Sequence, residues 1–291
     1  MKVEAFHHPM MIEIGGRLSY VNTIITTPDA PKGTVLCLHE FSAGAAMFQP
    51  LADQLAALGW KVVAPDMPGR GQSQRLPTAL YTWNTYVNVL AAVLRLHNLG
   101  PLVILGVGWG AMLALGLENL WRPRPAKLVL CDLPMKWQFS MDPRAQLMAQ
   151  LCEIVGQNDA DFMGQAQKIA EASPNIAADI LRDVARRLTG PKGARSLGTD
   201  PRIFASLRRD PKTTLSSAPL LRACTSPTEL LYTGLMPSQG EIDAMTNPQM
   251  TLRQIEDTNF FDCSEQSILL ALCDAIKSSP DQSKLIARPI S

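Results

Sequence analysis

Short continuous apolar runs alternate along this chain with segments of helical spacing. Each run is bounded by glycine, proline or polar residues, which is typical of strands buried on both faces of a parallel sheet. The runs span residues 34–38, 61–65, 102–107, 127–130, 229–232 and 251–255. Helical spacing follows at residues 46–58, 83–99, 109–120, 239–245 and 265–276. With an alternating, antiparallel strand at 18–27 before them, these elements predict an α/β protein whose mostly parallel sheet has helices on both faces.

The alternation pauses between about residues 134 and 227. Only helical patterns occur there, at residues 143–155, 160–171, 176–188 and, briefly, 203–207. An insertion at this point would cover the carboxyl ends of the strands, where open α/β sheets bind ligands. We therefore predict a core of residues 1–134 and 227–278, a helical lid (cap) of residues 135–226, and a loose C-terminal tail of residues 279–291.

Composition and charge exclude several classes of function. The 291 residues are 46% hydrophobic and 18% charged, with a formal net charge of +1, which gives no electrostatic case for nucleic acid or an anionic membrane. No signal peptide or membrane-spanning run is expected. The six cysteines are dispersed, which favours small core residues in a reducing cytoplasm over a disulfide set or a metal site. We expect no metal and no cofactor.

The segment from Gly106 to Gly110 carries the chain's most informative motif. It reads G-V-G-W-G and joins the apolar run 102–107 to the helix predicted from Trp109. Glycines at both ends of such a turn suit the nucleophile elbow, G-x-S-x-G, in which a strand turns sharply into a helix. The central position here is Gly108, which has no side chain and cannot act as a nucleophile.

Together with three further segments, this motif resembles the α/β-hydrolase fold superfamily over nearly the whole chain. Residues 38–44 (L-H-E-F-S-A-G) resemble the H-G-x-x-x-G loop, and residues 65–73 (P-D-M-P-G-R-G-Q-S) match the D-x-P-G-x-G-x-S turn. Residues 128–132 match the sixth strand and its exit. The resemblance implies an eight-stranded sheet with the lid after the sixth strand, and the layout is most similar to lidded bacterial hydrolases of esters, lactones and carbon–carbon bonds.

The chain departs from the superfamily's Ser-His-Asp triad at each of its three positions. Gly108 replaces the serine, and the segment 232–238, where the acid usually stands, contains no carboxylate. The segment 257–262 contains no histidine, and all four histidines (7, 8, 39 and 97) precede the elbow. Because the triad works as a unit, we predict a pseudo-hydrolase with a degenerate triad and no ordinary ester hydrolysis.

Some of the machinery survives a loss of side chains. The main-chain N–H groups of Trp109 and of Glu40 or Phe41 would still form an oxyanion hole, and the helix beginning at Trp109 adds its positive dipole end. The site would then favour a carbonyl, a carboxylate or an enolate. The residues we expect to bind a ligand are Glu40, Phe41, Gly108, Trp109, Trp137 and Phe139.

Several side chains near this site have two interpretations. Glu40, which replaces a glycine of the motif, repels anionic ligands or acts as a base if it faces the site, and otherwise points to the surface on its loop. His39 either holds its own loop or titrates beside the substrate, and Asp132 is either a displaced acid or a structural cap. Trp109 either fills the space of the lost triad or forms an apolar wall. Cys263 directly follows the segment 257–262, where the superfamily's histidine stands, and no obvious base lies near it in the sequence.

The lid also contributes a set of Met and aromatic side chains. They line an adaptable apolar pocket or form the lid's own core. They are Met135, Trp137, Phe139, Met141, Met148, Phe162 and Met163.

Three hypotheses for function remain open. The first is a non-hydrolytic homologue that binds a small apolar or carbonyl-bearing ligand. The second is an enzyme of altered chemistry, a lyase, isomerase or cyclase, for which Glu40, His39 and Asp132 are the candidate catalytic residues. The third is an interaction protein, including one that self-associates. A homodimer or a pathway-enzyme partner is compatible with any of them, and the identity of the ligand is not encoded in a recognisable motif.

Overall fold

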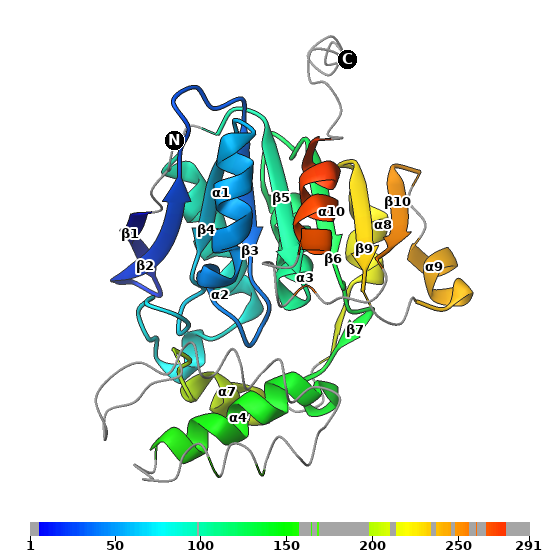
Figure 1. The fold of residues 1–291 in the computed structure, drawn as a ribbon. Helices are drawn as coiled ribbons and strands as arrows, with labels where there is room; N and C mark the ends of the chain where they lie inside the picture. Colours follow the sequence, from blue (N-terminus) through cyan, green and yellow to red (C-terminus); the bar gives the residue numbers. More distant parts are fainter. Residues whose placement is uncertain are drawn as a thin grey trace.

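One eight-stranded sheet organises the computed structural model, which describes residues 6–97, 99–156, 164, 168, 198–209, 214–233, 237–245, 248–255, 260 and 266–277. The strand order is β1-β2-β4-β3-β5-β6-β9-β10 (Figure 1). The strands are β1 (Phe6–Ile14), β2 (Arg17–Thr26), β3 (Thr34–Leu38), β4 (Lys61–Pro65), β5 (Leu102–Val107), β6 (Lys127–Cys131), β9 (Thr228–Tyr232) and β10 (Met250–Gln254). The neighbours among β4, β3, β5, β6, β9 and β10 pair in parallel, while β2 pairs antiparallel with both β1 and β4.

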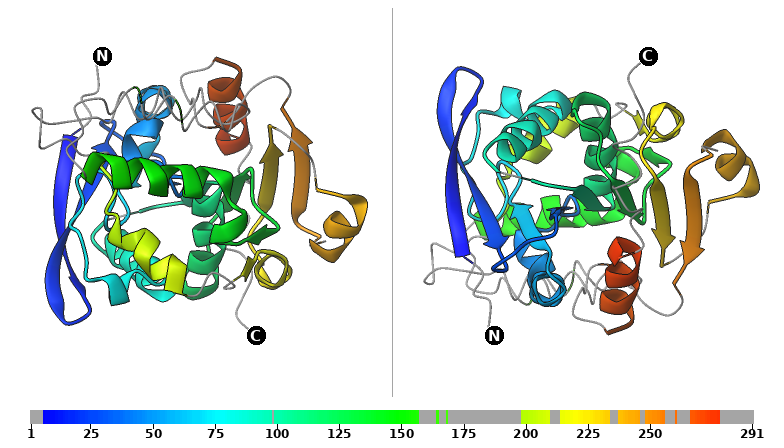
Figure 2. Two further views of the ribbon diagram at one scale, coloured as in Figure 1. Left: turned by 90° about the horizontal axis from the view of Figure 1, so that it is seen from below. Right: turned by 90° about the horizontal axis from the view of Figure 1, so that it is seen from above.

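Both faces of the central strands are buried, which explains their continuous apolar runs. Along β5, Val103 and Leu105 face one core and Leu102 and Ile104 face the other. Helices α1 (Gln49–Ala57) and α10 (Gln266–Lys277) cover the first face, and α2 (Trp83–Arg95), α3 (Trp109–Leu120) and α8 (Ala218–Ala223) cover the second (Figure 2). Helix α9 (Gln239–Met245) packs against α8. The predicted α/β architecture is therefore confirmed.

The insertion after β6 lies beyond the end of the sheet at which β5 and β6 end (Figures 1 and 2). Its described elements are a 3-10 turn (Phe139–Met141), α4 (Pro143–Gly156), α7 (Arg202–Arg209) and a small antiparallel pair, β7 (Lys136–Trp137) with β8 (Leu215–Ser216). It is tied to the core beside the turn of residues 65–73. There Gly71 N–H donates to Gly198 O over 2.6 Å and Asp200 N–H donates to Gly69 O over 2.7 Å.

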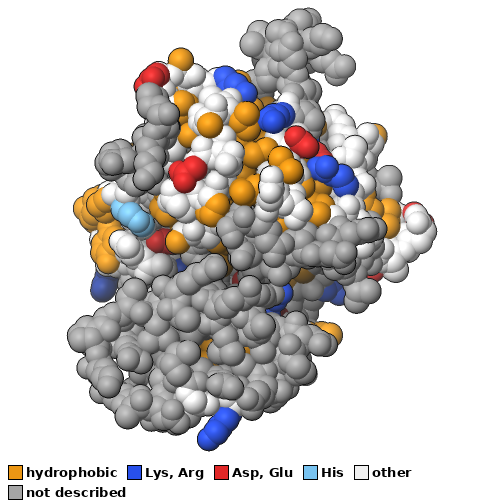
Figure 3. Space-filling view, in the orientation of Figure 1, with side chains coloured by type: hydrophobic (Ala, Val, Ile, Leu, Met, Phe, Trp, Pro, Cys, Tyr) orange, Lys and Arg blue, Asp and Glu red, His pale blue; other side chains and the backbone are white. Residues whose placement is uncertain are grey.

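No helix in the described part of the chain is long and apolar enough to span a bilayer. Exposed hydrophobic side chains gather at the outer edge of the sheet, on β1 and β2, where Met11, Leu18 and Tyr20 lie (Figure 3). Five of the six cysteines are described, and all five are buried free thiols.

The sequence-based elements match most of the described ones, with three corrections. Strand β1 was not located from the sequence, because it is an edge strand with only two inward aliphatic residues, Ile12 and Ile14, as a weak signal. The β7–β8 pair contradicts an all-helical insertion, because two-residue strands carry no periodicity. Helix α2 ends at Arg95, four residues early. The helices predicted at 160–171 and 176–188 lie almost wholly outside the described residues.

Candidate functional site

The glycine-rich turn after β5 adopts the sharp strand–turn–helix conformation that its sequence predicts. Gly108 caps α3 with φ 54° and ψ −114°, a conformation strained for any residue with a side chain. Gly106 and Gly110 are required by close approach, since a Cβ atom on Gly110 would lie 2.1 Å from the carbonyl oxygen of Leu38. Of the five residues of the turn only Gly108 is not buried. The elbow therefore keeps its backbone, and its apex remains accessible.

Two main-chain donors flank the apex. Trp109 is the first residue of α3, so its N–H group has no partner within the helix. Phe41 follows β3, the strand beside β5. Within the described part of the chain neither N–H group has a hydrogen-bond partner. The positive end of the α3 dipole lies at the same place, so this position suits a partly negative oxygen.

The side chain of Glu40 lies directly over Gly108. A Cβ atom built on Gly108 would be 2.9 Å from Cγ of Glu40 and 3.8 Å from its Oε1. Oε2 accepts hydrogen bonds from Ser42 N–H (2.6 Å) and from the Ser42 hydroxyl (2.5 Å). Glu40 is 5% exposed. The stem of a buried carboxyl group thus contacts the position at which a nucleophile's side chain would begin.

Burial raises the pKa of Glu40 above its ordinary value of 4.5, and the nearby carboxylate of Asp142 raises it further. The two Ser42 hydrogen bonds and the guanidinium of Arg144 act in the opposite direction. The charge is therefore expensive to bury, because no cation hydrogen-bonds to the carboxylate among the described residues. A carboxyl group that is buried, lies beside a candidate site and has a raised pKa, as Glu40 does, is typical of acid–base groups in proteins.

Asp132, the other candidate carboxylate, follows β6 and is held by the next strand. Its main chain has a φ of 45°, which aspartate tolerates better than most residues. Its Oδ1 accepts from Thr233 N–H (2.8 Å) and its Oδ2 from the Thr233 hydroxyl (2.7 Å). Burial raises its pKa, while the Thr233 hydrogen bonds lower it. Both oxygens are engaged in joining the ends of β6 and β9, which favours a structural cap.

His39 is fully buried and has both ring nitrogens engaged. Nδ1 donates to Glu40 O over 2.8 Å, and Nε2 accepts from Met67 N–H over 2.9 Å. The ring therefore joins its own loop to the turn of residues 65–73, and it has no nitrogen left for a ligand. The other histidines are on β1 or at the far end of the sheet, where His97 contacts Lys61 at the start of β4.

An aromatic group joins the core to the insertion after β6 beside the elbow. The ring of Phe41 lies 5.5 Å from that of Trp109 and 5.2 Å from that of Trp137, between centroids. Phe139 reaches Phe41 only through Phe204, 6.0 Å from each. Three of the predicted ligand-binding residues therefore come together directly. Phe204, on α7, was missed because a lone aromatic on a short helix gives no signal of its partners.

Arg70, which no sequence pattern singled out, is a fully buried cation within this aromatic group. Its guanidinium carbon lies 4.4 Å from the ring centre of Phe41 and 5.0 Å from that of Trp109. Nε donates to Phe41 O (2.7 Å) and Nη1 to the Tyr86 hydroxyl (2.9 Å). Arg70 thus fixes the peptide of Phe41 and stacks on the aromatic walls. Arg70 stands at one of the variable (x) positions of the D-x-P-G-x-G-x-S turn, so the motif does not predict a buried cation there.

Other predicted positions lie outside the described residues. These are Phe162, Met163, Cys263 and most of the segment 257–262. In the segment 232–238, the described residues are Tyr232, Thr233, Pro237 and Ser238, and none of these carries a carboxylate.

Comparison with known proteins agrees with this geometry. The family model described as the α/β hydrolase fold matches residues 33–150. A haloalkane dehalogenase from Psychrobacter cryohalolentis is 31% identical over 84 residues, which is 28% of either chain. An α/β hydrolase from Novosphingobium aromaticivorans superposes with a TM-score of 0.71 at 21% identity, covering 94% of this chain and 99% of that one.

The thioesterase domain from the curacin biosynthetic pathway gives a TM-score of 0.66, also at 21% identity, covering 94% of this chain and all of that domain. Likeness at this level of identity concerns the fold. The chain therefore has the α/β-hydrolase fold, with eight strands in its mostly parallel sheet.

Proposed function

We propose that this protein is a non-hydrolytic member of the α/β-hydrolase fold that binds a small carbonyl-bearing ligand over Gly108. The observation that carries the proposal is that the elbow lacks a nucleophile's side chain and has the carboxyl side chain of Glu40 beside it. The apex keeps the backbone of a nucleophile elbow, but Gly108 has no side chain. A Cβ atom built on Gly108 would lie 2.9 Å from Cγ of Glu40.

Hydrolysis by an acyl-enzyme route has no support in the described residues. It requires a nucleophile, a base that takes its proton, and a group that orients the base. Gly108 offers no nucleophile, and His39, the only histidine near the elbow, uses both nitrogens in main-chain contacts.

Binding has more support than hydrolysis. The unpaired N–H groups of Phe41 and Trp109 suit a carbonyl oxygen, because each donor would otherwise lack a partner. The rings of Phe41, Trp109 and Trp137 supply apolar walls beside them. A small ketone or ester with an apolar substituent fits both features.

The proposal is tested by calorimetry with a panel of small ketones, esters and lactones. We expect saturable binding of apolar carbonyl compounds, no release of product from aryl esters, and no labelling by a fluorophosphonate probe. Trp137→Ala should weaken binding at least about tenfold, which is about 1.4 kcal/mol. Trp121→Ala, at the opposite end of α3, is the matched control and should leave binding unchanged. Absence of binding across the panel, or labelling by the probe, would overturn the proposal.

A further inference from the structure

We infer that Glu40 is an acid–base group that moves a proton to and from the carbon next to the carbonyl of a ligand held over Gly108. The inference rests on the proposed binding function and adds a reaction class and a substrate class to it. The substrate class is enolisable ketones with an apolar substituent.

The position of Glu40 carries the inference. Its Cγ lies against the Cβ position of Gly108, at the apex of the elbow. Its Oε2 accepts hydrogen bonds from the N–H and the hydroxyl of Ser42. Oε1 has no hydrogen-bond partner among the described residues and is the oxygen nearer to the Gly108 apex. A carboxylate held by one oxygen and open at the other is oriented for proton transfer without losing side-chain entropy when a ligand binds.

The surroundings of Glu40 strengthen its basicity. It is 5% exposed, and the charged groups that act on it are Asp142 and Arg144, both from the lid. Burial and Asp142 raise its pKa, and Ser42 and Arg144 partly offset the effect. A base with a raised pKa takes a proton from carbon more readily, and the reaction is fastest when that pKa lies near the working pH.

The reaction balances with the groups present. Oε1 of Glu40 takes a proton from the carbon next to the carbonyl as that C–H bond breaks. The bonding pair forms the carbon–carbon double bond of an enolate, and the carbonyl π pair moves to the oxygen. The N–H groups of Phe41 and Trp109 donate to this oxygen, whose charge increases during the step. Return of the proton to the same carbon gives hydrogen exchange, and return to a conjugated carbon gives isomerisation.

Gly108 and Glu40 form one arrangement. A serine at position 108 would bring its Cβ against Cγ of Glu40, so a nucleophile and this carboxylate do not fit together without movement. Glycine at position 108 therefore leaves room for the carboxyl side chain of the neighbouring loop. A site that had only lost its nucleophile would not need a carboxyl group at position 40, because the motif's glycine there would leave the site open.

The test uses 4-phenyl-2-butanone in D₂O, with binding measured by calorimetry and exchange of the α-protons followed by NMR. We expect the protein to accelerate exchange and Glu40→Gln to slow it by about 100-fold or more. Gln retains an oxygen for Ser42, so binding of the ketone should change little. Glu153→Gln, the same chemical change on an exposed lid residue, is the matched control and should leave exchange unaltered.

A second readout separates catalysis from structure. The exchange rate should rise with pH with a midpoint above the ordinary range of a glutamate, and Ser42→Ala should lower that rate while the protein stays folded. Binding without accelerated exchange, or exchange unaffected by Glu40→Gln, would overturn the inference and leave the proposed binding function standing. Absence of binding by 4-phenyl-2-butanone and the rest of the panel would overturn both.

Discussion

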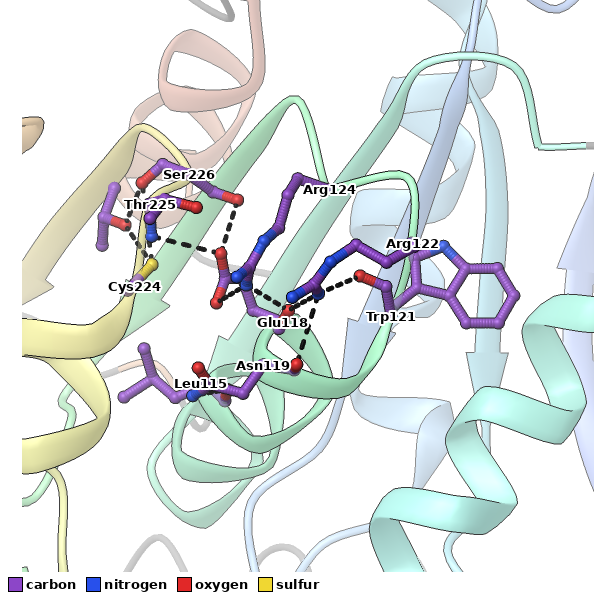
Figure 4. Close-up of polar contacts among 10 residues, drawn as sticks. Leu115, Glu118, Asn119, Trp121, Arg122, Arg124, Cys224, Thr225 and Ser226 are labelled. Carbon is purple, nitrogen blue, oxygen red and sulfur yellow. Dashed lines mark hydrogen bonds and ion pairs between the residues drawn. The ribbon is translucent and has the colours of Figure 1, made fainter. Parts of the chain in front are cut away.

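Two buried glutamates, one at each end of α3, differ in how their charge is compensated. Glu118, near the C-terminal end, is fully buried, and its Oε2 lies 2.6 Å from Nη1 of Arg124 (Figure 4). Its Oε1 accepts from Thr225 N–H (3.2 Å) and the Ser226 hydroxyl (3.0 Å). Glu40, at the other end, has one oxygen held by Ser42 and no cation bonded to it among the described residues.

Burial alone therefore does not mark the site. Glu118 has a counter-ion and partners from the segment before β9, so its charge joins α3 to that segment. The buried charge of Glu40 is only partly compensated, by Ser42 and Arg144, so it lowers the stability of the fold. A buried charge with only partial compensation persists where something besides stability requires it, which is the reason for proposing a function for Glu40.

The largest expected effect is on Glu118. Glu118→Ala would leave Arg124 and the two donors of residues 225 and 226 without their acceptor, and breaking a buried ion pair costs about 3–5 kcal/mol. We expect a loss of this size in the free energy of unfolding, measured by urea denaturation at pH 7. A loss under about 1 kcal/mol would remove the contrast between the two glutamates.

Gly108→Ser should come next. The positive φ costs on the order of 1–3 kcal/mol for a residue with a side chain, and the new Cβ would also press on Glu40. We expect this loss in unfolding experiments without any gain of esterase activity. Combining it with Glu40→Gly should recover part of the loss, and strict additivity of the two changes would show that the groups do not interact.

Glu40→Gln should act in the opposite direction to Glu118→Ala. The pKa of Glu40 is raised on folding, so its contribution to stability is fully present below the unfolded value of 4.5 and is lost as pH rises through the folded pKa. A neutral amide avoids that loss. We expect the variant to be more stable than the wild type at pH 7 by on the order of 1 kcal/mol, with the difference in Tm vanishing below pH 4.5. A destabilised variant at pH 7 would identify Glu40 as structural.

His97 supplies the smallest effect, with the opposite pH dependence. Burial lowers its pKa to about 4 from 6.5, and the nearby charges of Lys61 and His8 contribute. The unfolded chain takes up a proton first, so stability falls as pH drops from 6.5 to 4. Because the ring is partly exposed, we expect less than about 1 kcal/mol. His97→Gln should remove that slope from the Tm profile between pH 6.5 and 4, and an unchanged slope would contradict the assignment.

Much of the core could be predicted from the sequence because its central strands are buried on both faces. Continuous apolar runs such as 34–38 and 102–107 leave no other arrangement in a chain of alternating strands and helices. Strand β1 could not be predicted, because an edge strand needs few apolar residues. The β7–β8 pair of the insertion depends on contacts between residues about 80 positions apart, for which no local pattern exists.

The site was predictable in its backbone but not in its side-chain directions. The glycines of residues 106–110 encode the turn, so the position of Gly108 followed from the motif. Whether Glu40 points into the site or away from it depends on Ser42, whose hydroxyl and N–H orient the carboxylate. Arg70 could not be foreseen for the same reason, since its aromatic partners come from three separate segments.

The most direct measurement is a ¹³C NMR titration of the side-chain carboxyl groups, with and without a bound ketone. We predict that Glu40 titrates above its ordinary value of 4.5 and that its resonance shifts when the ketone binds, while the resonance of Glu118 is unaffected by the ketone. An ordinary titration of Glu40 that ignores the ligand would contradict the assignment of Glu40 as the working group of this site.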